Sequence, residues 1–216
     1  MLKVIRMFVV IIVIVIYAAA KAETGNFYKI IEIPSKAGFP HKVALFAADA
    51  VELPKKIVIF IPGNAFNMES WYPFARKFNT AGVSAVAVNV RSYDGIKSTI
   101  EYLADNGYKD ISLVGASLGG RVMLDVLSEN DFPAVSRLIA LSPYDGSSIK
   151  NNRYKKLFII SARDHWGIYR AVKGIYADSA EPKRIKELDT AVHAQHLLKG
   201  EFAKEVSEAI MQFILE

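Results

Sequence analysis

Residues 111–120 constrain the fold of this chain more than any other segment, because they indicate a strand, a sharp turn and a helix. Residues 111–114 are largely apolar, as at the end of a buried strand, and residues 120–128 continue with helical spacing. Between them, Gly115-Ala116-Ser117-Leu118-Gly119 is a G-x-S-x-G pentapeptide. So tight a turn strains its apical residue and excludes side chains two positions away. The turn would present the Ser117 hydroxyl beside a helix N-terminus, whose free N–H groups stabilise anions.

An acid and a histidine follow this serine along the chain. Asp164 comes just after the apolar run 157–162, where a buried parallel strand would meet its loop. His193 follows residues 184–188, whose alternation is typical of an edge strand. A serine hydroxyl needs a base within hydrogen-bond reach, and the base needs a group that orients it. The order serine, acid, histidine is that of the α/β-hydrolases.

Over residues 28–215 the chain resembles an α/β-hydrolase in its elbow, its late aspartate and the histidine ahead of its last helix. The resemblance implies that Ser117 is the nucleophile, His193 the base and Asp164 the acid. Asp145, after the preceding strand, is a competing acid, and His196 is a competing base.

The resemblance also implies an oxyanion hole made of two backbone N–H groups. One belongs to Leu118, directly after the nucleophile, and the other to Asn64. Pro62-Gly63-Asn64 is similar to the His-Gly-x turn of many α/β-hydrolases, although proline replaces the usual histidine. That replacement removes a hydrogen-bonding brace but leaves the backbone donor in place.

The remaining segments predict an α/β chain with a mostly parallel, doubly wound sheet and helices on both faces. The expected strands are two antiparallel leading strands at 27–33 and 41–46, followed by 57–61, 83–90, 111–114, 135–141, 157–162 and 184–188. The expected helices are 70–81 with Ser70 as N-cap, 95–106, 120–128, 168–180 and 202–215. Members of the family often insert a lid after the strand that ends at Leu141. Residues 143–156 are too short and polar for one, so we expect an open site without a lid domain.

The first 22 residues form a segment that is separate from the predicted domain. Residues 1–7 carry two cations, thirteen uncharged and mostly apolar residues follow at 8–20, and Ala20-Lys21-Ala22 ends the segment. This is the pattern of a secretory signal peptide over residues 1–22, with an uncleaved membrane anchor as the alternative. Residues 23–216 then form a single domain, which is secreted or periplasmic, or is anchored and faces outward.

The charge and the absence of cysteine narrow the function. Without residues 1–22 the formal net charge falls from +5 to +2, which gives little support for a nucleic-acid partner. The basic cluster at 150–156 is interpreted as a solvated loop. The chain has no cysteine, which excludes disulfides, a thiol nucleophile and thiolate metal ligands. No cofactor or metal is expected.

The sequence therefore predicts an exported serine hydrolase that cleaves carboxylic esters or related acyl bonds of small or accessible substrates. A peptidase or thioesterase on the same residues remains an alternative, as does a non-catalytic binding module of the cell envelope. The oligomeric state stays open.

Six aromatic residues near the strand ends could form a substrate pocket or belong to the core. They are Phe66, Trp71, Tyr72, Tyr144, Trp166 and Tyr169. Arg91 could be a cation at the site edge or an ion-pair partner.

Overall fold

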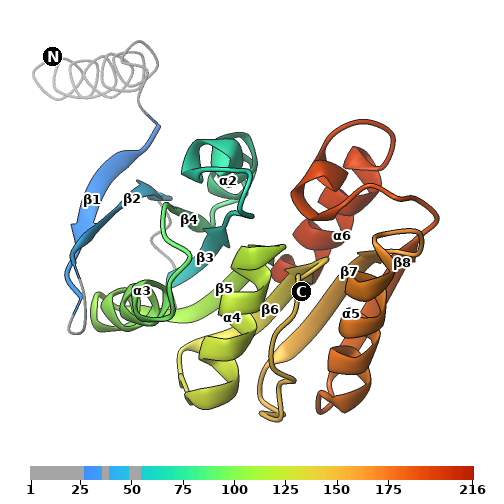
Figure 1. Ribbon diagram of the computed structural model, residues 1–216. Helices are drawn as coiled ribbons and strands as arrows, with labels where there is room; N and C mark the ends of the chain where they lie inside the picture. Colours follow the sequence, from blue (N-terminus) through green and yellow to red (C-terminus); the bar gives the residue numbers. More distant parts are fainter. Residues whose placement is uncertain (1–26, 36–38, 49–54) are drawn as a thin grey trace, which may run out of the picture.

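The computed structural model describes residues 27–35, 39–48 and 55–216 (Figure 1). The segment 1–22 lies outside these described residues. No helix within the described ranges is long and apolar enough to cross a membrane.

Eight described strands form one sheet in the order β1-β2-β4-β3-β5-β6-β7-β8. β2 runs antiparallel to its neighbours β1 and β4, whereas the strands from β4 to β8 pair in parallel. Continuous apolar runs suit these inner strands, because helices cover both of their faces. The strands are β1 (Lys29–Ile33), β2 (His41–Phe46), β3 (Lys55–Ile61), β4 (Ser84–Val88), β5 (Tyr108–Ala116), β6 (Val135–Leu141), β7 (Lys155–Ser161) and β8 (Lys183–Leu188).

Helices lie on both faces of the sheet, as the alternation of segments predicts. Along β3, Ile57, Ile59 and Ile61 pack in the core under α3, α4 and α5, whereas Val58 and Phe60 pack under α2 and α6. Figure 1 shows α3, α4 and α5 side by side across the front of the sheet. The helices are α2 (Tyr72–Thr80), α3 (Tyr93–Asp105), α4 (Leu118–Glu129), α5 (Trp166–Asp178) and α6 (Ala203–Leu215), with two short 3-10 helices, η1 (Met68–Trp71) and η2 (Ala194–Leu198).

The predicted doubly wound, mostly parallel fold is thus confirmed, and so is the absence of a lid between β6 and β7. Residues 142–154 form only turns and irregular backbone there. The carboxyl ends of the central strands, where ligands bind in such sheets, are not covered by an inserted domain.

Two local predictions are wrong. Ser70 does not cap α2, because the chain first makes the 3-10 turn η1 and α2 begins at Tyr72 with a proline in its first turn. Lys156 is not solvated: it lies in β7, its side chain is fully buried, and its Nζ donates to the carbonyl of Tyr154 at 2.7 Å. Burial lowers the pKa of Lys156.

Candidate active site

Ser117 occupies a sharp, strained turn between β5 and α4. Its backbone has φ 48° and ψ −116°, a conformation that side-chain-bearing residues rarely adopt. A Cβ on Gly115 would lie 2.8 Å from the carbonyl oxygen of Gly119, and one on Gly119 would lie 2.5 Å from the carbonyl oxygen of Pro62. Because these contacts are with backbone atoms that cannot swing away, both positions require glycine.

Ser117, His193 and Asp164 form one chain of hydrogen bonds, although they lie far apart in the sequence. His193 Nδ1 lies 2.8 Å from Asp164 Oδ2, and His193 Nε2 lies 2.9 Å from Ser117 Oγ. An ionised carboxylate can only accept, so Nδ1 carries the hydrogen and the unprotonated Nε2 faces the serine hydroxyl. This arrangement can remove the proton from Ser117 as its oxygen attacks.

The loops after β7 and β8 hold the acid and the histidine in place. Asp164 is only 7% exposed, and its second oxygen, Oδ1, accepts from the backbone N–H of His165 at 2.8 Å. The loop that carries His193 is tied to β7, because the Ser161 hydroxyl donates to the carbonyl of Val192 at 2.5 Å. The histidine ring therefore needs little reorganisation to act on the serine.

The competing residues lie apart from this chain of hydrogen bonds. Asp145 is exposed in the turn after β6, and the described hydrogen bond of His193 Nδ1 goes to Asp164 instead. His196 is exposed and borders the pocket above Ser117. Its ring packs edge-on against Phe66 with centroids 4.8 Å apart.

The loop after β3 runs close to the nucleophile, at 62–66. A Cβ on Gly63 would lie 3.3 Å from the Cβ of Ser117. Gln195, which is 3% exposed, accepts from the backbone N–H of Gly63 through Oε1 at 3.3 Å. Arg91 Nη1 donates to the carbonyl of Phe66 at 2.8 Å and to that of Gly63 at 3.4 Å. Gln195 and Arg91 thus brace a loop in which Pro62 offers no polar side chain.

The backbone N–H groups of Leu118 and Asn64, which the sequence analysis assigns to an oxyanion hole, have no acceptor among the described hydrogen bonds. Leu118 is the first residue of α4, so its N–H has no acceptor within the helix. None of the described hydrogen bonds uses the backbone N–H of Asn64. This residue is exposed and lines the pocket together with Ser117. Within the described ranges, no three His, Cys, Asp or Glu side chains gather as ligands for a metal ion.

A cavity of about 160 Å³ opens above Ser117, and of the six aromatic candidates one is among its lining residues. Phe66 lines it, whereas Trp71 is buried and stacks on Phe60 in the core. Tyr72 packs against other aromatic side chains of the core. Of the two alternatives that the sequence leaves open, these two residues therefore follow the second and belong to the core. The lining consists of Gly63, Asn64, Ala65, Phe66, Ser117, His193, Ala194, Gln195 and His196.

The remaining aromatic candidates are not among the lining residues of this cavity, or their side chains are not described. Tyr144 is 58% exposed, and the hydroxyl of Tyr169 donates to Glu187 Oε2 at 3.0 Å. The side chain of Trp166 lies outside the described part of the structure.

Gln195 is the residue of this site that the sequence analysis missed. It stands between two histidines in a short segment without any local signal, and its partner Gly63 lies 132 residues away. For Arg91 the sequence leaves open a cation at the site edge or an ion-pair partner. In the structure it donates to two backbone carbonyls, and no ion pair of the described residues includes it.

Solved structures resemble this fold closely, although no protein-family model and no curated protein matches the sequence. An esterase domain from Rhodothermus marinus superposes with a TM-score of 0.69 at 16% identity, over 86% of this chain and 97% of that one. An esterase from Exiguobacterium antarcticum gives 0.69 at 10% identity, over 86% and 99%. An alpha-beta serine hydrolase homologue from Coxiella burnetii gives 0.65 at 16% identity, over 86% and 96%. With its sheet order and its serine elbow, the chain therefore has the α/β-hydrolase fold.

Proposed function

We propose that this protein is a serine hydrolase that cleaves carboxylic esters through an acyl-serine intermediate. The observation that carries the proposal is the continuous hydrogen-bonded chain from Ser117 Oγ through the ring of His193 to Asp164. The same constellation on unrelated folds performs acyl transfer. Structural neighbours described as esterases support the ester as the substrate class.

The geometry supports a two-step reaction. Ser117 Oγ attacks the ester carbonyl carbon while its proton passes to His193 Nε2, and the carbonyl oxygen becomes an anion facing the N–H groups of Leu118 and Asn64. Collapse of this tetrahedral intermediate breaks the bond to the alcohol, which receives the proton from His193. A water molecule, deprotonated by the same nitrogen, then attacks the acyl carbon; the bond to Ser117 Oγ breaks, Oγ takes the proton back from His193, and the acid leaves. Asp164 stabilises the imidazolium formed in each step.

The cavity of roughly 160 Å³ lies at the carboxyl ends of the strands, and no inserted domain encloses it. Such an open site favours small esters or bulky, accessible ones. A peptidase or thioesterase would use the same groups. A fluorophosphonate probe, which forms a covalent bond with activated serines, separates these enzymes from a binding module. Comparing 4-nitrophenyl esters with matched 4-nitroanilides then separates ester from amide cleavage.

The decisive experiment compares the full-length protein with Ser117→Ala and with Ser128→Ala, a control near the exposed end of the same helix. We expect Ser117→Ala to abolish fluorophosphonate labelling and to lower kcat at least about 1000-fold with the fold intact, because the oxyanion hole alone supports only residual catalysis. Ser128→Ala should keep both the fluorophosphonate labelling and the kcat of the unmodified protein. Retention of most esterase activity by Ser117→Ala would contradict the proposal.

Export is a further part of the proposal, and it rests on the sequence pattern of residues 1–22. Cleavage after Ala22 leaves Glu23 as the new N-terminus. Mass spectrometry of protein recovered from the cell envelope and the medium measures this directly. An intact Met1 on outward-facing, membrane-bound protein would support the anchored alternative instead.

A further inference from the structure

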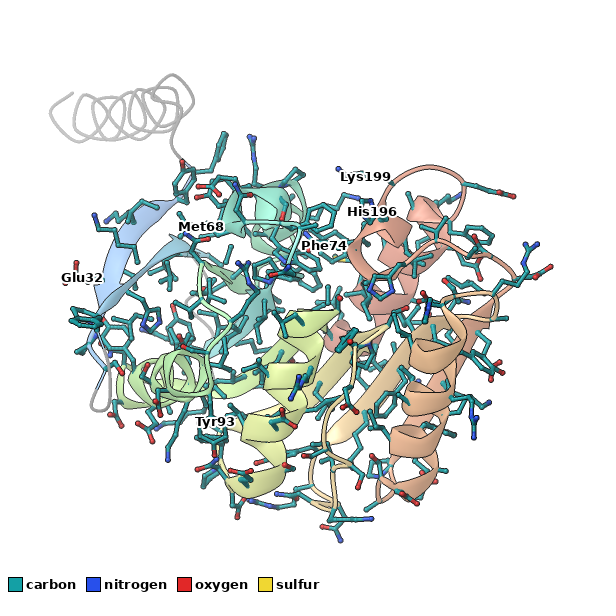
Figure 2. The ribbon with its side chains drawn as sticks, in the orientation of Figure 1. Glu32, Met68, Phe74, Tyr93, His196 and Lys199 are labelled. Atoms are coloured by element: carbon teal, nitrogen blue, oxygen red, sulfur yellow. The ribbon has the colours of Figure 1, made fainter. Side chains whose placement is uncertain are left out.

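A second and larger cavity lies next to the pocket of Ser117. It measures about 380 Å³ and shares Phe66 and Gln195 with the first cavity. One wall comes from η1 and α2, and the other from η2, its following residues and α6. Figure 2 labels Phe74 on the first wall and Lys199 on the second. The lining consists of Phe66, Glu69, Ser70, Pro73, Phe74, Lys77, Gln195, Leu198, Lys199 and Ser207.

Two lysine side chains line this cavity from its opposite walls. Lys77 Nζ lies 5.6 Å from the ring centroid of Phe74, and Lys199 Nζ lies 5.4 Å from that of Phe66. Both lysines are exposed, and within the described part of the chain neither is paired with a carboxylate. Glu69 is the one acidic residue in the lining, so the charged side chains sum to +1.

The uncharged part of the lining suits a ligand with an apolar chain that ends in a polar group. Phe66, Phe74 and Leu198 supply apolar surface between the two lysines. The buried amide of Gln195 separates the cavities: its Oε1 accepts from Gly63 on the side of Ser117, and its Nε2 donates to the Ser70 hydroxyl at 2.7 Å on the other side. A substrate held at Ser117 therefore reaches the second cavity by passing along the ring of Phe66.

We propose that the second cavity is a substrate subsite, in which Lys77 and Lys199 bind an anionic group carried by the ester several bonds from its reacting carbonyl. This proposal rests on the proposed function and names its substrate class: esters that combine an apolar stem with a terminal anion. Two cations facing one cavity attract such a group. Exposure to solvent limits the strength of each contact.

The test compares anionic with neutral esters of equal length. Carboxylate-terminated 4-nitrophenyl esters (glutarate, adipate and suberate) are paired with their ω-methyl esters, which places the charge on the acyl side. Butanoate esters of 4-hydroxyphenylacetic and 4-hydroxyphenylpropanoic acid are paired with their methyl esters, which places it on the leaving group. The full-length enzyme should prefer the anionic partner roughly tenfold in kcat/KM in at least one series, since each exposed ion pair contributes about threefold to fivefold.

Charge variants assign this preference to the cavity. Lys77→Ala and Lys199→Ala should each lower the anionic-to-neutral ratio roughly threefold, and the double variant should abolish it. Lys199→Arg should keep it, and Glu69→Gln should raise it about twofold by removing the acid. Lys109→Ala is the matched control, because this exposed lysine lies at the start of β5, at the opposite end of that strand from Ser117. Raising the salt concentration should reduce the ratio in the wild type and leave it unchanged in the double lysine variant.

The ratio separates failure of this inference from failure of the proposed function. Hydrolysis that depends on Ser117, without any preference for the anionic partner in either series, overturns the subsite and leaves the serine hydrolase standing. A preference that survives the double lysine variant also overturns it. Absence of both hydrolysis and fluorophosphonate labelling refutes the two proposals together.

Discussion

The two walls of the candidate active site are built by different means. The elbow wall, residues 115–119, is fixed by the backbone itself: glycines permit the turn, and added side chains would collide with carbonyl oxygens. The loop wall, residues 62–66, is held by side chains from elsewhere, namely Gln195 and Arg91. Steric exclusion is close to absolute, whereas a single hydrogen bond contributes only about 1 kcal/mol. The elbow should therefore tolerate almost no change, and the loop should weaken by degrees.

The sharpest test of the elbow is Gly119→Ala. The new Cβ would lie 2.5 Å from the carbonyl oxygen of Pro62 and 2.7 Å from that of Ile61, so both walls would have to move. We expect the free energy of unfolding to fall by at least about 3 kcal/mol and esterase activity to be lost. Thermal denaturation and kcat/KM measure the two effects.

Gly174→Ala is the matched control for that substitution. Gly174 is exposed within α5, and nothing lies within 4 Å of its added Cβ. Alanine there should stabilise the protein by up to about 1 kcal/mol, because it favours the helix. If Gly119→Ala were as harmless as this control, the elbow would not be set by backbone contacts.

The contrast between the walls also explains what the sequence could predict. The G-x-S-x-G motif predicts the elbow because the residues that must be small for steric reasons are neighbours in one short segment. Chain order then located Asp164 and His193, since each follows a parallel strand and such strands end at one edge of the sheet. Buried apolar runs predicted the strands for the same local reason.

Features that depend on distant partners were missed or misassigned. Nothing near Gln195 signals its bond to Gly63, which forms only when η2 packs beside the end of β3. The sequence left Trp71 either beside the substrate or in the core, and only the η1 turn, which buries it against Phe60, decides for the core. A lysine-rich stretch looked solvated, yet parallel pairing with β6 and β8 places Lys156 inside the sheet. In each case tertiary packing overrode the local pattern.

On the loop wall the largest effect should come from Asn64→Pro. Proline removes the N–H that we assign to the oxyanion hole, so kcat should fall about 100-fold to 1000-fold, as for the loss of one donor. Asn64→Ala keeps the N–H and should cost little. Measuring kcat for both variants, with unfolding midpoints to verify the fold, decides between them. A 100-fold loss in Asn64→Ala would identify the side chain as the donor and refute our assignment.

Gln195→Met tests the first side-chain brace. Methionine has a similar length but cannot accept from Gly63 or donate to Ser70. We expect kcat to fall roughly tenfold with a smaller change in KM, because a loosened hole loses contacts made in the transition state. Ser70→Ala is the control, since it disturbs the other end of the amide and leaves the bond to Gly63. Equal losses in the two variants would show that Gln195 acts by packing η1 rather than by holding the loop.

The smallest single effect should come from Arg91→Met, about threefold in kcat, because Arg91 meets the loop at two carbonyls but leaves its N–H groups untouched. If the guanidinium acted through its charge on the oxyanion, added salt would shrink this loss and Arg91→Lys would restore full activity. A brace predicts a loss of kcat that salt does not change.

Arg91 and Gln195 hold the same residue, Gly63, from its carbonyl and its N–H. Each can compensate for the other, so the double variant with Gln195→Met should lose more than the product of the two single losses. A double-mutant cycle in kcat measures this coupling, and strictly multiplicative losses would show that the two side chains do not hold the loop jointly.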